Sequence, residues 1–125
     1  MIFDTDIFIW IQRGNVKAAR LVEHETERYL SIQTYMELLQ GVNDKAQHRK
    51  TLNFLKDFGF MTLPLTENIG HRAAIYVEEY ALSYHVRAGD ALIAATAVEN
   101  NLTLCTGNAK HFKPIKELKL RVFRP

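Results

Sequence analysis

The sequence predicts an α/β fold with a mostly parallel central sheet and helices on both of its faces. Short apolar, β-prone segments alternate along the chain with longer segments in which apolar residues recur at helical spacing. Strands separated by helices pair in parallel, and the crossover helices then cover both faces of the sheet. The length of 125 residues suits one domain, residues 1–125, with a real core.

The first half of the chain predicts two strands and four helices. Thr5 or Asp6 is expected to cap the first helix, and Asn43 or Asp44 the fourth, because short polar side chains satisfy the free N–H groups of a first turn. Glycines are expected to end three of the helices. The predicted order is a strand at 2–3, helices at 7–13 and 16–27, a strand at 29–32, a helix that carries Glu37 and ends near Gly41, and a helix that ends at Gly59.

The second half predicts three strands, two helices and a helical turn. Thr66 is expected to cap a long helix, in which residues 69, 73, 77, 80 and 84 form an apolar face. Gly89 is expected to break the chain before a strongly apolar helix. The predicted order is a strand at 60–63, the helix after Thr66, a helix at 90–99, a strand at 102–105, a helical turn at 109–112 and a strand at 120–123.

Composition excludes several classes of protein. The single cysteine, Cys105, rules out an internal disulfide, which fits a reducing, cytoplasmic compartment. The apolar run at 91–98 is far shorter than the roughly 20 residues that a membrane-spanning helix needs, so no membrane is expected as a partner. Asp4 and Asp6 interrupt the apolar start of the chain, which argues against a signal peptide.

Three carboxylates lie beside strong apolar runs, where charged side chains are rare unless something compensates them. Asp4 ends the first strand, Glu37 lies in the opening turns of a helix, and Asp90 opens the apolar helix. Parallel sheets bind ligands at the carboxyl ends of their strands, so we expect these side chains to meet at one edge. A pocket of like charges needs a cation, and hard divalent metals take oxygen ligands. The pattern therefore predicts metal-assisted phosphate chemistry.

Each acid also has a structural explanation when it is considered alone. Asp90 suits a helix cap, and Glu37 suits the edge of a helix face that reaches solvent. Asp6 is expected to cap the first helix and to have a supporting role at most. The five histidines show no metal-binding spacing, and surface packing is the expected role of His111.

Positive charge gathers at the C-terminal end, although the net charge of the chain is only +2. The last 20 residues carry six basic side chains against one acidic side chain, Glu117, so the remainder of the chain is acidic. Such a segment could contact a polyanion, but charge alone favours an ordinary solvated surface.

Four short motifs, in order, resemble those of PIN-domain proteins. Residues 4–9, Asp-Thr-Asp-Ile-Phe-Ile, are similar to the first motif, in which a strand ends in an Asp-Thr pair. Residues 31–38 are similar to the second motif with its glutamate, residues 88–97 to the third, and residues 106–112 to the fourth. The match spans essentially the whole chain, and within the family it is most similar to bacterial or archaeal toxins of the VapC type.

The resemblance implies a three-layer α/β/α sandwich and an endoribonuclease, dependent on Mg²⁺ or Mn²⁺, that is the toxin of a type II toxin–antitoxin system. Metal-activated water would hydrolyse RNA phosphodiester bonds, with Asp4, Glu37 and Asp90 as the catalytic and metal-binding residues. The resemblance also implies a homodimer and a small cognate antitoxin. An acidic pocket would accept an Arg or Lys side chain from that antitoxin.

The remaining site residues are expected to support these three carboxylates. Thr106 and Asp6 would orient the metal ligands. Asn108 stands where many members of the family carry aspartate, and a neutral amide would weaken binding of a second metal. Lys110 and Lys113 are the candidates for contacts with the RNA backbone.

Two alternatives compete with the nuclease. The missing acid at position 108 suits a catalytically weak PIN-like module that binds RNA or protein. The start Asp4-Thr5-Asp6 superficially matches the Asp-x-Asp motif of aspartyl-nucleophile phosphatases. That chemistry needs a later acidic motif, and Glu117 is the only acid after Thr106.

Overall fold

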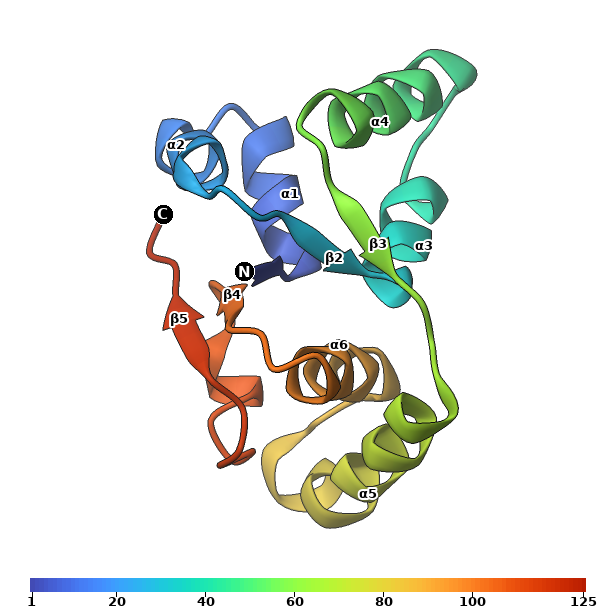
Figure 1. Ribbon diagram of the computed structural model, residues 1–125, viewed down its shortest axis with the longest axis vertical. Coiled ribbons are helices and arrows are strands. Elements are labelled where there is room, and N and C mark those ends of the chain that lie inside the picture. The colour runs from blue at the N-terminus through green and yellow to red at the C-terminus, as the bar shows by residue number, and fades with distance from the viewer.

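A five-stranded sheet forms the middle layer of the molecule. The computed structural model describes residues 1–125, and neighbouring strands are all parallel, in the order β3-β2-β1-β4-β5 (Figure 1). The strands are β1 (Ile2–Phe3), β2 (Tyr29–Ser31), β3 (Met61–Leu63), β4 (Leu104–Thr106) and β5 (Leu120–Val122). The predicted parallel sheet is confirmed, with strand ends displaced by at most two residues.

Helices cover both faces of this sheet. Helices α5 and α6 lie on one side, whereas α1, α2 and α4 lie on the other (Figure 1). The helices are α1 (Thr5–Gln12), α2 (Val16–His24), α3 (Ile32–Gln40), α4 (Lys45–Asp57), α5 (Glu67–Tyr84), α6 (Ala88–Glu99) and the 3₁₀ helix η1 (Ala109–His111). The arrangement is the α/β/α sandwich that the resemblance implied.

Alternate residues of the central strands point to opposite faces and enter two separate apolar cores. Ile2 and Leu104 belong to the core on the α5 and α6 side, whereas Phe3 and Cys105 belong to the core on the α1 and α2 side. All four side chains are fully buried, and Cys105 packs in the core as a small apolar residue. The pair β1–β4 is therefore enclosed from both sides, and its carboxyl ends have a fixed position.

Two helix starts differ from the prediction. Asp4 caps α1, because its carboxylate accepts the N–H of Thr5, so Asp6 lies within the first turn and is not the cap. Gly89 does not break the chain, since α6 begins at Ala88 and includes it. The caps predicted for the two longest helices are confirmed: Asp44 caps α4 and Thr66 caps α5.

The apolar face of α5 is rotated slightly from the predicted face. Ile69 and Ala73 are buried as expected, but the next buried residue is Tyr76. Tyr80 is partly buried, whereas Tyr84 is about half exposed. An α-helix has 3.6 residues per turn, so steps of four and three must alternate for side chains to stay on one face.

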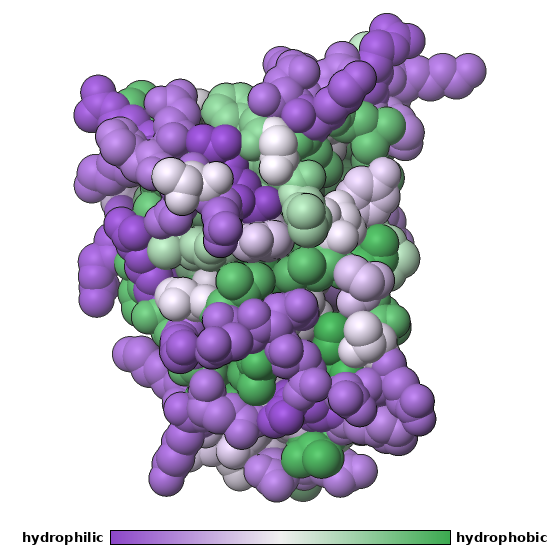
Figure 2. Space-filling model, viewed as in Figure 1, coloured by the Kyte–Doolittle hydropathy of each residue, from purple (hydrophilic) through white to green (hydrophobic).

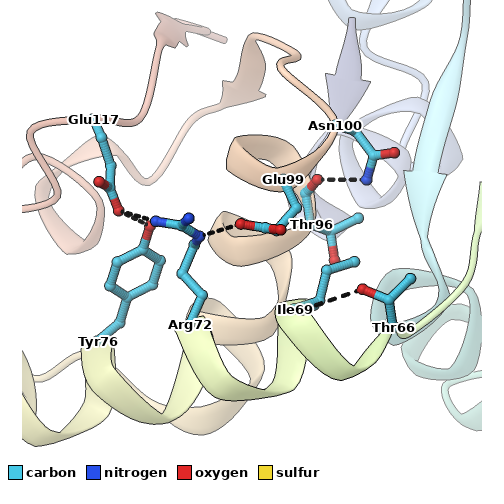
Figure 3. Close-up of polar contacts among 8 residues, drawn as sticks. All are labelled: Thr66, Ile69, Arg72, Tyr76, Thr96, Glu99, Asn100 and Glu117. Atoms are coloured by element: carbon cyan, nitrogen blue, oxygen red, sulfur yellow. Dashed lines mark hydrogen bonds and ion pairs between the residues drawn. The ribbon is translucent and has the colours of Figure 1, made fainter.

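A polar cluster ties the segment before β5 to α5 and α6 (Figure 3). Arg72 donates a hydrogen bond to the Glu99 carboxylate at 2.5 Å and another to the Glu117 carboxylate at 2.8 Å. The hydroxyl of Tyr76 also donates to Glu117. The bonds from Tyr76 and then Arg72 lower the pKa of the Glu117 carboxyl. The ion pairs are partly exposed to water, which weakens them, so the buried Tyr76 is the strongest anchor of this segment.

The surface separates into polar and apolar regions. Polar side chains dominate the α4 end and the α5 end of the molecule, and apolar side chains gather between them (Figure 2). The exposed apolar residues include Met36 on α3, Met61 on the edge strand β3, and Leu65 after it. None of the helices has the length and apolar character needed to cross a membrane.

We predict that Tyr76→Phe lowers the free energy of unfolding by about 1–2 kcal/mol, because Glu117 loses its buried donor. Urea unfolding at pH 7 measures this change. Tyr84→Phe is the matched control, since it removes a hydroxyl from a half-exposed ring and should change stability by less than about 0.5 kcal/mol. Equal losses in the two variants would show that the cluster contributes nothing specific.

Candidate metal and catalytic site

The order of the strands in the sheet reverses between β1 and β4. The chain places β2 and β3 on one side of β1, and β4 and β5 on the other. The connections that leave β1 and β4 therefore turn away from each other, and open parallel sheets bind ligands in the crevice that results. Asp4 directly follows β1, and Thr106 ends β4. The sequence predicted that the acids meet at the carboxyl ends of the strands. The strand order leaves a crevice for a ligand at that same edge of the sheet.

Asp4 is a buried carboxylate held by two hydrogen bonds. Only 6% of the residue is exposed. Its Oδ1 accepts the N–H of Thr5 at 2.7 Å, and its Oδ2 accepts the hydroxyl of Thr106 at 2.7 Å. The N–H of Asp4 donates to the carbonyl of Cys105 at 2.9 Å, which extends the β1–β4 pairing to this point. The parallel register therefore fixes Asp4 against Thr106.

Asp6 reaches from the first turn of α1 to the loop that follows β4. Its Oδ2 accepts the N–H of Gly107 at 2.8 Å. A Cβ atom at position 107 would lie 2.7 Å from that oxygen, so the Asp6 carboxylate can approach this closely only because position 107 is glycine. Asp6 Oδ1 is buried and accepts no hydrogen bond. The predicted capping role is therefore wrong, and the carboxylate lies between two elements of the site.

Glu37 and Asp90 come from two helices that contact each other, α3 and α6. Glu37 Oε1 accepts the side-chain N–H of Gln33 at 3.1 Å and lies 3.8 Å from the position of a Cβ atom on Gly89. Asp90 lies in the first turn of α6, whose N-cap residue, Arg87, makes no capping bond. Both acids are partly exposed. Of the two, Asp90 is close enough to repel the Asp4 carboxylate.

The charges around Asp4 are not compensated. Burial first, and then repulsion from Asp6 and Asp90, raise the pKa of Asp4 to about 7, although the bonds from Thr106 and Thr5 act in the opposite direction. Burial also raises the pKa of Asp6. The ion pairs of the molecule all involve other acids. The site therefore concentrates negative charge without any basic side chain to balance it.

The residues present suit a hard divalent cation such as Mg²⁺ or Mn²⁺. The acidic side chains at the site would bind a cation through carboxylate oxygens, which these ions prefer. One of these oxygens, Asp6 Oδ1, is buried and accepts no hydrogen bond. No group of three His, Cys, Asp or Glu side chains is arranged here to hold a metal by itself. Mg²⁺ usually keeps several waters and needs only one or two carboxylates, so the donor set fits this ion. Metal binding by Asp4, Glu37 and Asp90 stays a prediction.

The other predicted residues have separate positions. The N–H of Asn108 donates to the hydroxyl of Thr106 at 2.9 Å, which places this residue beside the site through its backbone. Lys110 and Lys113 are exposed on and after η1. His111 is partly buried, and its Nδ1 has no hydrogen-bond partner.

Sequence reasoning missed two features of the site. The first is Gly107, whose role depends on the distant Asp6. The second is a chain of hydroxyls, in which Thr5 donates to Thr34 at 3.0 Å, and Ser31 caps α3 through the N–H of Thr34 at 3.0 Å. A serine directly before a helical segment, as at Ser31, is a capping signal that was available in the sequence.

Comparison with known proteins agrees with this geometry. The model of the PIN domain family matches residues 1–118. Ribonuclease VapC1 of Rickettsia felis is 33% identical over 96% of this chain and 93% of its own length. Ribonuclease VapC10 of Mycobacterium tuberculosis is 36% identical over 95% of this chain and 90% of its own length.

Solved structures show the same fold. A toxin–antitoxin complex from Klebsiella pneumoniae superposes with a TM-score of 0.79 at 29% identity, and covers 94% of this chain and 93% of its own. The VapBC2 complex of Rickettsia felis, bound to a promoter DNA fragment, has the same TM-score of 0.79 at 23% identity, with coverage of 99% and 100%. By its sequence match over nearly its full length and by its fold, this chain belongs to the PIN domain family.

Proposed function

We propose that this protein is a metal-dependent endoribonuclease and the toxin of a toxin–antitoxin pair. The observation that carries the proposal is the uncompensated charge around Asp4, at the crevice between β1 and β4. Relatives named as VapC ribonucleases, which match the chain over nearly its whole length, support the choice of RNA as substrate. Mg²⁺ or Mn²⁺ would supply an activated water and stabilise charge on the scissile phosphate.

The chain's own residues then have distinct tasks. Asp4 and Asp90 would hold the ion, and Glu37 would bind it directly or through water. Thr106 keeps Asp4 in place through the bond to Oδ2, so the carboxylate needs little rearrangement when the ion arrives. Lys110 and Lys113 are exposed and would contact RNA phosphates, which fixes the position of the strand without reading its sequence.

A partner segment would reach the site along an apolar groove. The groove lies between α1, α3 and α4, has a volume of about 380 Å³, and includes Phe8, Leu38 and Phe54 in its lining. Glu37 lines the same groove, so a segment seated there leads to the acidic site. An antitoxin that places an Arg or Lys against Asp4, Glu37 and Asp90 would supply the missing positive charge and exclude the metal. The solved toxin–antitoxin complex with this fold supports such a partner.

A homodimer is the expected assembly. Met36, Met61 and Leu65 are each about half exposed; α3 and β3, which carry Met36 and Met61, contact each other, and Leu65 lies two residues after β3. The edge strand β3 leaves its outer backbone groups unpaired within the sheet. This surface is the one we propose for contact with a second copy of the chain.

The phosphatase alternative is disfavoured by the position of Glu117. This residue is the only acid after Thr106, and it is engaged by Arg72 and Tyr76 on α5. It therefore does not supply an acidic motif to the crevice beside Asp4.

The first prediction of the proposed function is RNA cleavage that requires Mg²⁺ or Mn²⁺ and stops in EDTA. Asp4→Asn, Glu37→Gln and Asp90→Asn should each lower the rate by roughly 100-fold or more, because metal-assisted chemistry is worth several kcal/mol. Cleavage of a broad panel of RNAs is the measurement. Asp57→Asn, at the exposed end of α4, is the matched control and should cleave normally. Equal cleavage in EDTA and in Mg²⁺ would show that the mechanism is wrong.

A second prediction concerns stability in the metal-free protein. Asp4 has a usual pKa of 3.8 and a folded pKa of about 7, so between these values the folded state keeps a proton that the unfolded state has lost. Its contribution to stability is present below about pH 4 and is lost as the pH rises towards 7, by up to about 4 kcal/mol.

Urea unfolding in EDTA at several pH values measures this effect. The stability of Asp4→Asn relative to the natural chain should increase steadily from pH 4 to about pH 7, since the amide stays neutral and still caps α1. Asp57→Asn should follow the natural chain in parallel across the range. If Asp4→Asn also runs in parallel, the buried Asp4 carboxylate has no raised pKa.

A third prediction concerns the toxin role. Expression of this chain alone in bacteria should slow growth, and expression of Asp4→Asn to the same level should not, because only the first form cleaves RNA. Growth curves with protein levels checked by immunoblot are the measurement. Equal toxicity of the two forms would remove cleavage as the cause.

A further inference from the structure

The candidate site has a neutral residue at position 108 and an acidic residue at position 6. Asn108 is neutral and approaches the site through its backbone N–H, which donates to Thr106. Asp6 is an acid, and its Oδ2 accepts the N–H of Gly107, the residue immediately before Asn108. A carboxylate is therefore present at the loop after β4, but it comes from the first turn of α1.

Gly107 is what allows this approach. A Cβ atom there would lie 2.7 Å from Asp6 Oδ2 and 3.4 Å from the carbonyl oxygen of Phe123. The Asp6 carboxylate is therefore the group that a Cβ atom would displace, whereas the contact with the Phe123 carbonyl is close to ordinary. Any side chain at position 107 would push Asp6 away from the loop.

The charge of Asp6 is not needed for structure. An asparagine would accept the same N–H of Gly107 through its amide oxygen, without a buried charge. Asp6 instead leaves Oδ1 buried without a donor, which is unfavourable, and it repels Asp4 more strongly than Asp90 does. A destabilising charge beside another buried acid is typical of a group that acts on a ligand.

We propose that Asp6 supplies the fourth negative charge of the metal site, in place of a carboxylate at position 108, and that Gly107 is required to admit it. The inference rests on the proposed metal-dependent function and names the residue that acts on the ion. Asp6 is then a member of the site, and Asn108 contributes through its backbone.

Calorimetric titration with Mn²⁺ tests this assignment without any measurement of cleavage. Asp6→Asn removes the charge, keeps an acceptor for Gly107, and should weaken Mn²⁺ binding by roughly tenfold or more. Asp57→Asn removes a charge of the same kind from the exposed end of α4 and should leave the affinity unchanged. Unchanged affinity in Asp6→Asn would overturn the proposal.

A charge exchange provides the second arm. Asn108→Asp in the Asp6→Asn background returns one carboxylate to the loop after β4 and should restore most of the lost Mn²⁺ affinity. A residue that only holds the fold would not be rescued in this way. Loss in the single variant without any recovery in the double variant would refute the idea that the two positions supply the same charge.

Gly107→Ala provides the third arm, as a double-mutant cycle. It should weaken Mn²⁺ binding in the natural chain, because the new Cβ displaces Asp6. It should have a smaller effect in the Asp6→Asn background, where no charge is left to displace. Equal effects in both backgrounds would show that Gly107 acts independently of Asp6.

The results separate this inference from the proposed function. Mn²⁺ affinity that depends on Asp6 and is rescued at position 108, in a protein that cleaves no RNA, would support the inference and refute the nuclease. Metal-dependent cleavage, with Mn²⁺ affinity indifferent to Asp6→Asn, would support the nuclease and refute the inference. A natural chain that binds no Mn²⁺ would refute both.

Discussion

The hydrogen bond from Thr106 to Asp4 joins residues 102 positions apart and holds the two central strands at the point where their connections diverge. It forms because β1 and β4 pair in parallel with Phe3 opposite Cys105, so that the next residues along the chain, Asp4 and Thr106, lie side by side. Two apolar cores enclose these strands and leave Asp4 little freedom to move. The remaining acids of the site are positioned relative to this fixed carboxylate.

Two groups of acidic side chains in the molecule differ in whether basic side chains compensate their charge. Near the start of β5, Glu99 and Glu117 are compensated by Arg72 and Tyr76, and the bonds to Glu117 lower its pKa (Figure 3). Asp4 forms no ion pair with a basic side chain, and its pKa is raised instead. The first group stabilises the fold, and the second carries unfavourable charge that a bound cation would relieve. This contrast is the physical basis for assigning a ligand to one cluster and a structural role to the other.

Much of the fold was predictable because it depends on local patterns. Alternation of strands and helices predicted the parallel sheet, and the capping roles of Asp44 and Thr66 followed from residue type alone. Local rules failed where a distant group competes. Gly89 was expected to break the chain, but it lies inside α6, close to Gln33 and Glu37 of α3, where a larger side chain would be crowded.

The sequence by itself determined which acids are unusual, because Asp4, Glu37 and Asp90 stand beside apolar runs and their order matches a known family. The sequence did not determine which acid caps a helix and which acid belongs to the candidate site. Asp4 proved to be both a helix cap and the buried centre of the site, and Asp6 proved not to be a cap. The capping bond of Asp4 is local, but the bonds from Thr106 to Asp4 and from Gly107 to Asp6 join residues more than 100 positions apart, which only the pairing of β1 with β4 brings together.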